Sequence, residues 1–240
     1  MIEINGISKS YNKGSVKAVD NLNLKIKSGE IFGFLGPNGA GKTTTIKMLV
    51  GLLNPDQGNI KVAGHDMAAN TLDAKMNIGY VPDNPELYDR LTGTEYLNFM
   101  GDVYKVPANE RKDRIQHFLE MFELRDAASD LIKSYSHGMK QKIALTGALL
   151  HNPAVWILDE PMVGLDPKSA HLLKEQMRAH CDSGNTVFFS THVLEVAEKL
   201  CDRIGIINKG KLVAIGTMEE LRQGDNADSL ENIFLELTDK

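Results

Sequence analysis

Residues 36–44 read GPNGAGKTT and carry the most specific chemical signal in the sequence. Glycines in this run let the backbone curl so that its N–H groups converge on an anion such as a phosphate. The Lys42 ammonium group can contact the β- and γ-phosphates of a nucleotide, and the Thr43 hydroxyl can ligate Mg²⁺. The predicted nucleotide contacts come from Gly36, Asn38, Gly39, Ala40, Gly41, Lys42, Thr43 and Thr44.

The residues on either side of this loop support the prediction. Residues 31–35 form a short apolar run typical of a buried strand, and residues 43–53 have the pattern of a helix. A glycine-rich loop between a strand and a helix binds phosphate with its own N–H groups and with the positive end of the helix dipole. A glycine-rich turn with an incidental lysine would not need this context, so we expect the chain to bind a nucleoside triphosphate.

Two carboxylates, Asp159 and Glu160, end a second apolar strand that begins at Val155. Burial of either carboxylate in the centre of a sheet would be costly, so both are expected at its carboxyl edge, where ligands bind in open α/β sheets. Successive side chains of a strand point to opposite sides. Asp159 is therefore expected to face Mg²⁺, while Glu160 faces the attacking water as a general base.

His192 is the third candidate catalytic group, beside Lys42 and Glu160. It follows a predicted strand at residues 186–190 and precedes a predicted helix at residues 193–200. This position places it at the same rim as the phosphates. A neutral imidazole there could hydrogen-bond the γ-phosphate or hold the attacking water.

The order of the predicted elements indicates an α/β fold. Apolar and polar side chains alternate at residues 22–26, and isoleucines roughly mark another strand at residues 2–7. Alternation indicates one face in water, which favours an antiparallel layer. After residue 154 strands and helices alternate, which favours a largely parallel sheet. The strands predicted in this part cover residues 155–159, 186–190, 204–208 and 211–215, and the helices cover residues 168–181, 193–200 and 229–237.

Between these parts the pattern becomes helical. Residues 84–151 repeat apolar side chains at helical spacing, with helix-start signals at Thr92 and Ser136. We therefore predict one domain with a phosphate-binding-loop (P-loop) NTPase core, which contains a mostly parallel sheet and an N-terminal antiparallel β layer. Its segments are a core of residues 1–83 and 152–222, an inserted helical subdomain of residues 84–151, and a helical tail of residues 223–240.

Composition narrows the classes of function. A chain of 240 residues with 42% hydrophobic residues can bury a substantial core. Its net charge of −5 disfavours a dedicated nucleic-acid binder. Cys181 and Cys201 form no CxxC pair, so buried thiols are favoured, although a disulfide stays possible. The sequence shows no secretory signal and no apolar run of ~20 residues that could cross a bilayer, so a role at a membrane would need another chain to span it.

Residues 135–139 read YSHGM and complete a recognisable set of motifs. Together with the phosphate-binding loop and the two carboxylates, they resemble the ATP-binding subunit of ABC transporters along essentially the whole chain. The family motif is usually LSGGQ; Ser136 and Gly138 match it, and the other three positions depart from it. The resemblance implies that Ser136 and Gly138 contact ATP. Ser136 would also cap the following helix and aim its positive end at phosphate.

Further positions carry over from the resemblance. Tyr11 matches the aromatic residue that stacks on adenine, although a surface tyrosine between strands is the alternative. Asp166 belongs to a Gly-Leu-Asp sequence that matches the loop crossing to the partner subunit, and it is counted with the nucleotide-binding residues. His192 matches the switch histidine of the family.

Asp83 is a departure with chemical consequences. The family usually has a glutamine at this place, which touches Mg²⁺ and the attacking water. Asp83 could still bind Mg²⁺, or it could be a turn residue between Pro82 and Pro85. The metal ligands implied by motif and resemblance together are Thr43, Asp83 and Asp159.

The resemblance also implies partners. Two copies, or this chain and a homologous ATPase subunit, would face each other head to tail, with ATP and Mg²⁺ between the P-loop of one and Ser136 of the other. Hydrolysis would power transport of an unknown substrate through a separate integral-membrane permease, which would place the chain in the cytoplasm on the inner face of the cell membrane. In three features the chain is similar to the ATP-binding subunits of exporters with a separate permease: its short tail, Asp83 and the SLENIFLEL ending. No nucleic-acid partner is expected.

Two other functions are compatible with the motifs. A soluble ABC-type ATPase could act on a ribosome or nucleic-acid complex, but such proteins usually carry two ATPase halves or long coiled-coil insertions. This sequence has one phosphate-binding loop, no heptad run and an acidic balance. A nucleotide-binding scaffold without turnover would fit Asp83 and His137, whereas Glu160 and His192 favour hydrolysis.

Overall fold

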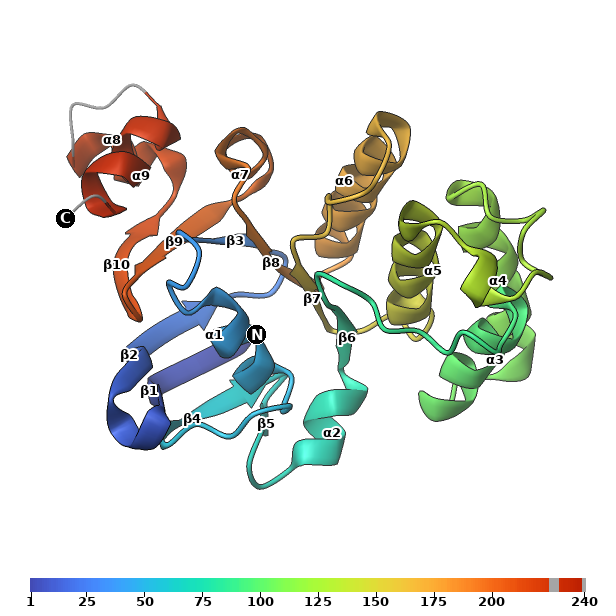
Figure 1. Cartoon of the computed structure of the whole chain (residues 1–240), viewed down its shortest axis with the longest axis horizontal. Helices are drawn as coiled ribbons and strands as arrows, with labels where there is room; N and C mark the ends of the chain where they lie inside the picture. The colour runs from blue at the N-terminus through green and yellow to red at the C-terminus, as the bar shows by residue number, and fades with distance from the viewer. Residues whose placement is uncertain (225–228, 239–240) are drawn as a thin grey trace.

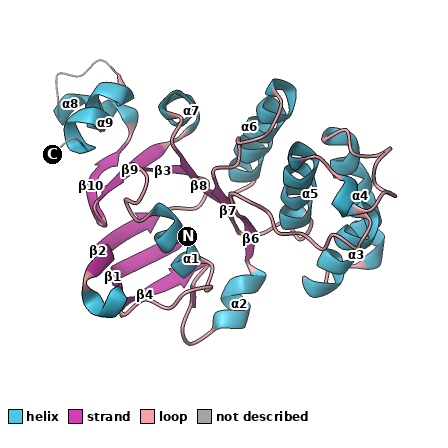
Figure 2. Cartoon of the chain, viewed as in Figure 1, coloured by secondary structure: helices cyan, strands magenta, loops and turns pink. Residues whose placement is uncertain are grey.

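The computed structural model describes residues 1–224 and 229–238, which form two sheets and the helices around them (Figure 1, Figure 2). The strands are β1 (Ile2–Tyr11), β2 (Val16–Ile26), β3 (Ile31–Leu35), β4 (Gln57–Val62), β5 (His65–Asp66), β6 (Ile78–Val81), β7 (Val155–Asp159), β8 (Thr186–Thr191), β9 (Arg203–Asn208) and β10 (Lys211–Gly216). The helices are α1 (Lys42–Leu49), α2 (Thr71–Met76), α3 (Gly93–Val103), α4 (Ala108–Met121), α5 (His137–Leu149), α6 (Pro167–Asp182), α7 (Leu194–Leu200), α8 (Met218–Gly224) and α9 (Leu230–Thr238), with 3₁₀ turns at Asn12–Gly14 and Ile132–Ser134.

The smaller sheet is antiparallel and has the strand order β2-β1-β4-β5. Ile4 of β1 pairs with Leu24 of β2, and both side chains are buried, while Asn5 is exposed. One face of the sheet therefore packs on the core and the other meets water. This confirms the antiparallel layer expected from the alternating sequence.

The larger sheet has the order β10-β9-β3-β8-β7-β6. The pairs from β9 to β6 are parallel, and β10 pairs antiparallel with β9. Strands β3, β7 and β8 are buried along their whole length, which agrees with their continuous apolar sequences. The mostly parallel sheet is confirmed, and it brings the carboxyl ends of β3, β7 and β8 to one edge.

Helices α3, α4 and α5 come from the segment that was predicted to be helical. Thr92 caps α3: its side chain accepts a hydrogen bond from the Glu95 backbone N–H, and the Glu95 carboxylate accepts one from the Thr92 backbone N–H. Ser136 caps α5 by accepting a hydrogen bond from the Met139 N–H at 3.3 Å. Both helix-start predictions are therefore confirmed.

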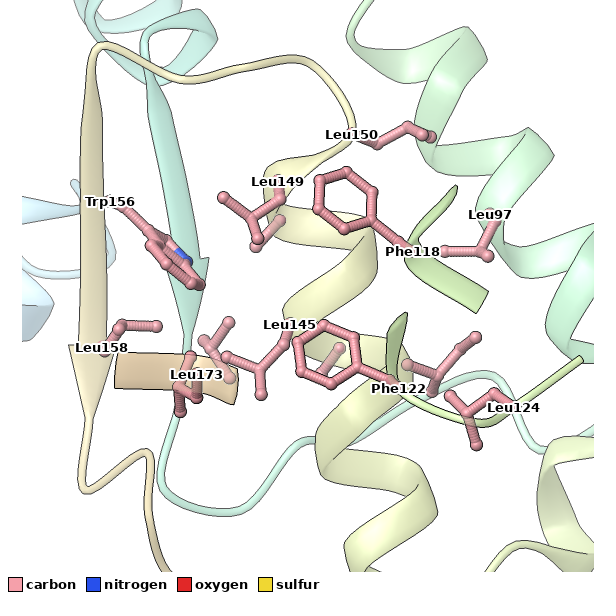
Figure 3. Packing of buried hydrophobic residues seen from close by; sticks show 14 of the residues in the cluster. Leu97, Phe118, Phe122, Leu124, Leu145, Leu149, Leu150, Trp156, Leu158 and Leu173 are labelled. Atoms are coloured by element: carbon pink, nitrogen blue, oxygen red, sulfur yellow. The ribbon is translucent and has the colours of Figure 1, made fainter. Parts of the chain in front are cut away.

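A buried cluster joins these helices to the sheet (Figure 3). Leu145 and Leu149 of α5 lie between Trp156 of β7 on one side and Phe118 and Phe122 on the other. Most residues of α5 are therefore buried, because the helix separates the sheet from the outer helices. A rigid packed contact of this kind positions the N-terminus of α5 relative to β7.

Some local features differ from the sequence predictions. The helix after the phosphate-binding loop ends at Leu49 rather than at residue 53, because Gly51 adopts a left-handed conformation with φ of 66° that stops the helix. The short elements β5, α2 and α8 were not predicted, since each spans too few residues to show a periodic pattern. Part of the predicted tail, residues 225–228 and 239–240, lies outside the described residues; α8 extends into its first two residues, and α9 occupies most of the rest.

The two cysteines are free thiols, as the sequence favoured. Burial raises the pKa of Cys181 to about 11 and also raises that of Cys201. Both therefore behave as packing residues rather than as nucleophiles.

Over residues 1–224 and 229–238, every helix is too short or too polar to cross a bilayer.

Candidate nucleotide site

The phosphate-binding loop leaves β3 and turns into α1 at the carboxyl edge of the larger sheet. Gly41 has a φ of 112° and precedes the first residue of α1. A Cβ atom at Gly41 would lie 2.3 Å from the Ala18 carbonyl oxygen, and one at Gly36 would lie 2.4 Å from the Ile207 carbonyl oxygen. The glycines at both ends of the loop are therefore required by the backbones of β2 and β9, which pass behind the loop.

Lys42 is the first residue of α1, and its ammonium group folds back over the loop. Its Nζ donates hydrogen bonds to the carbonyl oxygens of Gly36 at 2.5 Å and Pro37 at 3.2 Å. Burial lowers the pKa of Lys42, while the carboxylates of Glu160 and Asp159 act in the opposite direction. The loop thus holds a cation where phosphate oxygens would enter, with two carboxylates on the far side.

A cavity of about 230 Å³ opens beside this loop. Its lining combines the loop with Ala18, Asp83, Asp159 and Glu160. Because the three parallel strands end at one edge, groups from distant parts of the sequence meet there. The structure therefore places the predicted metal ligands and the predicted general base next to the predicted phosphate site.

Asp159 is the last residue of β7 and is almost fully buried. Its Oδ1 accepts a hydrogen bond from the Ser190 hydroxyl at 2.5 Å. Ser190 lies directly opposite Asp159 in the register of β7 and β8. This bond fixes one carboxylate oxygen and orients the group toward the cavity.

Glu160 lies just beyond the end of β7 and has a φ of 49°, in the left-handed region that non-glycine residues rarely adopt. Such a conformation costs roughly 1–2 kcal/mol. Hydrogen bonds from its N–H to the Ser190 carbonyl oxygen at 3.3 Å and to the Ser190 hydroxyl at 3.1 Å help to hold it. Because the strand stops at Asp159, the expected alternation does not separate the two side chains, and both line the same cavity.

His192 follows β8 and pairs with Glu160. The His192 Nδ1 lies 2.9 Å from Glu160 Oε2, and the His192 backbone N–H donates to the same oxygen at 3.3 Å. The His192 side chain is 62% exposed and that of Glu160 is 15% exposed. The pair therefore presents the imidazole toward the surface and keeps the carboxylate inside. Both residues also line a second cavity of about 400 Å³, which continues from the first along the outer side of the loop.

Five predicted nucleotide contacts line neither cavity in the described part of the chain, and one of them, Ala40, is buried within the loop. Ser136 and Gly138 are at the start of α5, which Figure 1 shows separated from α1 by β6 and β7. Tyr11 ends β1 and is 41% exposed. Asp166 caps α6, and its carboxylate accepts hydrogen bonds from the Ser169 N–H and hydroxyl at 2.9 and 2.6 Å. The roles of these five residues toward a nucleotide stay predictions.

Asp166 also links two parts of the molecule. Its Oδ2 lies 3.2 Å from the Lys142 ammonium group on α5. The hydrogen bonds from Ser169 and then the Lys142 ammonium group hold the pKa of Asp166 well below its usual range. In this chain the carboxylate of Asp166 therefore ties α5 to the loop that follows β7.

The donor set of the first cavity suits Mg²⁺. Thr43, Asp83 and Asp159 all line it and offer one hydroxyl and two carboxylates. Mg²⁺ prefers oxygen ligands and often uses one or two carboxylates together with phosphate oxygens. These three side chains thus fit the ion that usually accompanies a nucleoside triphosphate.

Several residues of the site gave no sequence signal. Ser190 and Ala18 sit on strands and act through register and backbone, which only the sheet order reveals. Val163 and Phe234 line the second cavity from segments that follow Glu160 and from α9. A motif search would not find them, because their role depends on packing over long sequence distances.

The fold and this edge of the sheet define a P-loop nucleotide hydrolase. Comparison with known proteins narrows the class. The family described as ABC transporter matches residues 19–163. The linearmycin resistance ATP-binding protein LnrL of Bacillus subtilis is 43% identical over 221 residues, which cover 92% of this chain and 70% of LnrL.

Two solved structures resemble the whole fold. An ATP-binding subunit of an ABC transporter superposes with a TM-score of 0.94 at 33% identity, with 99% of each chain covered. A dimeric ATP-binding cassette in a post-hydrolysis state, bound to ADP and Pi, gives a TM-score of 0.82 at 26% identity and covers 91% of this chain and 99% of that one. The chain belongs to the ABC transporter family, as an ATP-hydrolysing subunit.

Proposed function

We propose that this chain hydrolyses Mg-ATP as a head-to-tail dimer and thereby drives export through a separate membrane permease. The observation that carries the proposal is the meeting of Lys42, Asp159, Glu160 and His192 at one cavity edge. A cation, an oxygen-rich metal site and a carboxylate base are the groups that phosphoryl transfer to water requires.

In the proposed reaction, Glu160 takes a proton from the water that attacks the γ-phosphorus. The bond from that phosphorus to the β–γ bridging oxygen breaks, and ADP and phosphate leave. His192 holds one oxygen of the Glu160 carboxylate through Nδ1 at 2.9 Å, so its Nε2 is the ring nitrogen directed to a γ-phosphate oxygen. Lys42 neutralises charge on the β- and γ-phosphates.

Mg²⁺ would be held by Thr43 and Asp159, with Asp83 as a third ligand; Thr43 and Asp83 are exposed, whereas Asp159 is buried. When bound, the ion offsets the negative charge of the phosphates. Asp83 adds a negative charge at this place, where a glutamine would be neutral. We expect this charge to make nucleotide binding more dependent on Mg²⁺ than a glutamine would.

A second subunit is needed because Ser136 and Gly138 lie away from the chain's own cavity. The capped N-terminus of α5 carries partial positive charge, which would attract the γ-phosphate bound by a partner. ATP would therefore favour the closed dimer, and ADP would favour the open one, since a ligand shifts an equilibrium by its differential affinity. The residues 84–151, including α5, would form the subdomain that moves.

The permease would dock near the start of this helical segment. Tyr88 is 58% exposed and Phe99 is 41% exposed, and their rings meet edge to face at 5.4 Å between centroids. Exposed apolar patches often mark protein contacts, and this aromatic pair is the surface that we propose for the permease. The permease would hold the chain at the inner face of the cell membrane.

The name of one relative favours export over import. LnrL is a resistance protein by its name, and an ATP-driven transporter confers resistance by removing a compound from the cell. By this similarity we propose an exporter; the identity of the cargo depends on the permease.

Membrane recovery tests the proposal. The chain is co-expressed with a candidate integral-membrane permease, and the two are sought together in the membrane fraction. The double variant Tyr88→Glu, Phe99→Glu should lose the association, whereas Val213→Glu, an exposed apolar position on β10, should keep it. Recovery with ribosomes instead of membranes would favour the soluble ATPase, and binding of ATP without phosphate release would favour a scaffold.

A further inference from the structure

The C-terminal helix reaches the catalytic cavity. Phe234 of α9 lines the second cavity together with Glu160, His192, Asp83 and Val163. Its neighbour Leu235 is 46% exposed. Helix α9 thus directs one aromatic side chain toward the catalytic pair, although it lies about seventy residues further along the chain than Glu160.

Buried side chains hold α9 against the elements that carry the site. Leu230 and Ile233 are buried in a cluster with Leu35 and Ala197. Leu35 directly precedes the phosphate-binding loop, and Ala197 belongs to α7, the helix that follows His192. Helix α9 therefore packs both on β3, the strand that leads into the loop, and on α7, the helix that follows His192.

A polar contact fixes the other end of α9. The buried Asn208 side chain donates hydrogen bonds to the carbonyl oxygens of Leu237 and Thr238, both at 3.3 Å. These carbonyls belong to the last turn, which has no intrahelical donors. The preceding residue of β9, Ile207, lies against Gly36 and Gly41 of the loop. One strand thus contacts both the loop and the end of α9.

We infer that α9 is a wall of the catalytic cavity and that Phe234 is a positioning residue for the Glu160–His192 pair. This inference rests on the proposed function. The ring lines the same cavity as the largely exposed imidazole, where it would limit both the rotamers of that imidazole and the access of water. Loss of the ring would let His192 move away from Glu160, and small displacements of catalytic groups reduce rate strongly.

Kinetics separate positioning from binding. Phe234→Ala should lower kcat about tenfold and leave KM for ATP within about twofold, because the phosphate-binding loop is intact. Phe234→Leu, which keeps an apolar side chain of similar reach, should restore most of the rate. Leu235→Ala is the matched control on the exposed face of the same helix and should behave like the unchanged chain. Equal kcat in the two alanine variants would overturn the inference.

A fluorescence measurement does not depend on turnover. Trp156 is the one tryptophan of the chain and is fully buried. The tryptophan fluorescence of Phe234→Trp should change when Mg-ATP is added, whereas that of Leu235→Trp should not. Both variants also carry Glu160→Gln, so that bound ATP is retained. An unchanged Phe234→Trp signal, while calorimetry shows nucleotide binding, would refute the inference even if Phe234→Ala folds poorly. A chain that binds no ATP at all would instead refute the proposed function.

Discussion

Replacement of Glu160 by glutamine tests the proposed chemistry with little structural disturbance. Glutamine has the same size and still offers a side-chain oxygen to the His192 N–H and to its Nδ1. The bonds from the residue 160 N–H to Ser190 involve only the backbone of that residue, so the left-handed turn is retained. What changes is that an amide cannot accept the proton of the attacking water.

The expected loss follows from that single change. A well-placed general base contributes about 10²–10⁴-fold to a rate, which corresponds to ~3–5 kcal/mol of activation free energy. Glu160 is 85% shielded from solvent, with 15% of its side chain exposed, so bulk water is a poor substitute for it. We expect kcat to fall by at least about a hundredfold, with nucleotide affinity retained.

Phosphate release under saturating Mg-ATP measures this loss, and calorimetric titration with ATP measures affinity. Glu175→Gln is the matched control, since Glu175 also pairs with a histidine, His171 at 3.4 Å, but on the exposed surface of α6. If Glu160→Gln retained turnover within about threefold of Glu175→Gln, Glu160 would not be the base and the reaction proposed above would be wrong.

Three further predictions concern other parts of the molecule. Lys42→Ala should weaken ATP binding by at least about tenfold in a calorimetric titration, whereas Lys47→Ala on the exposed side of the same helix should not, since Lys42 alone folds over the loop. Burial lowers the pKa of His151 and of His180 to about 4, below the ordinary 6.5, so the folded chain binds fewer protons than the unfolded chain; the free energy of unfolding from urea titrations should fall as pH drops from 6.5 toward 4, by up to about 1.4 kcal/mol per pH unit for each histidine, and a flat profile would contradict this. Phe122→Ala should cost about 3–5 kcal/mol in chemical unfolding because its ring is fully buried, while the half-exposed Phe99→Ala should cost far less.

Much of the fold could be predicted from local sequence. Residues 31–35 and 155–159 are continuous apolar runs, and the structure gives strands with those same bounds. Thr92 and Ser136 marked helix starts because their side chains satisfy free N–H groups within a few residues. Signals of this kind depend on neighbouring residues and need no knowledge of tertiary structure.

The site was predictable to the extent that its motifs are local. The phosphate-binding loop and the two carboxylates each occupy one short segment, and the strand order then brings them together. Ser190 and Phe234 escaped prediction because their positions depend on the register of β7 with β8 and on the packing of α9. The left-handed turn at Glu160 escaped as well, since the predicted strand ends at Asp159 and a glutamate after it does not by itself indicate a positive φ.

The most direct test of the account is the mass of the Glu160→Gln variant in solution. One chain has a mass of 26.5 kDa. Light scattering coupled to size-exclusion chromatography should give twice that mass with Mg-ATP and the mass of one chain with Mg-ADP. The additional change Ser136→Ala should weaken the ATP-dependent dimer, because it removes the helix cap that would face the partner's phosphate in the proposed dimer. A mass of one chain at saturating Mg-ATP, with nucleotide shown to be bound, would contradict the claim that the γ-phosphate joins two subunits.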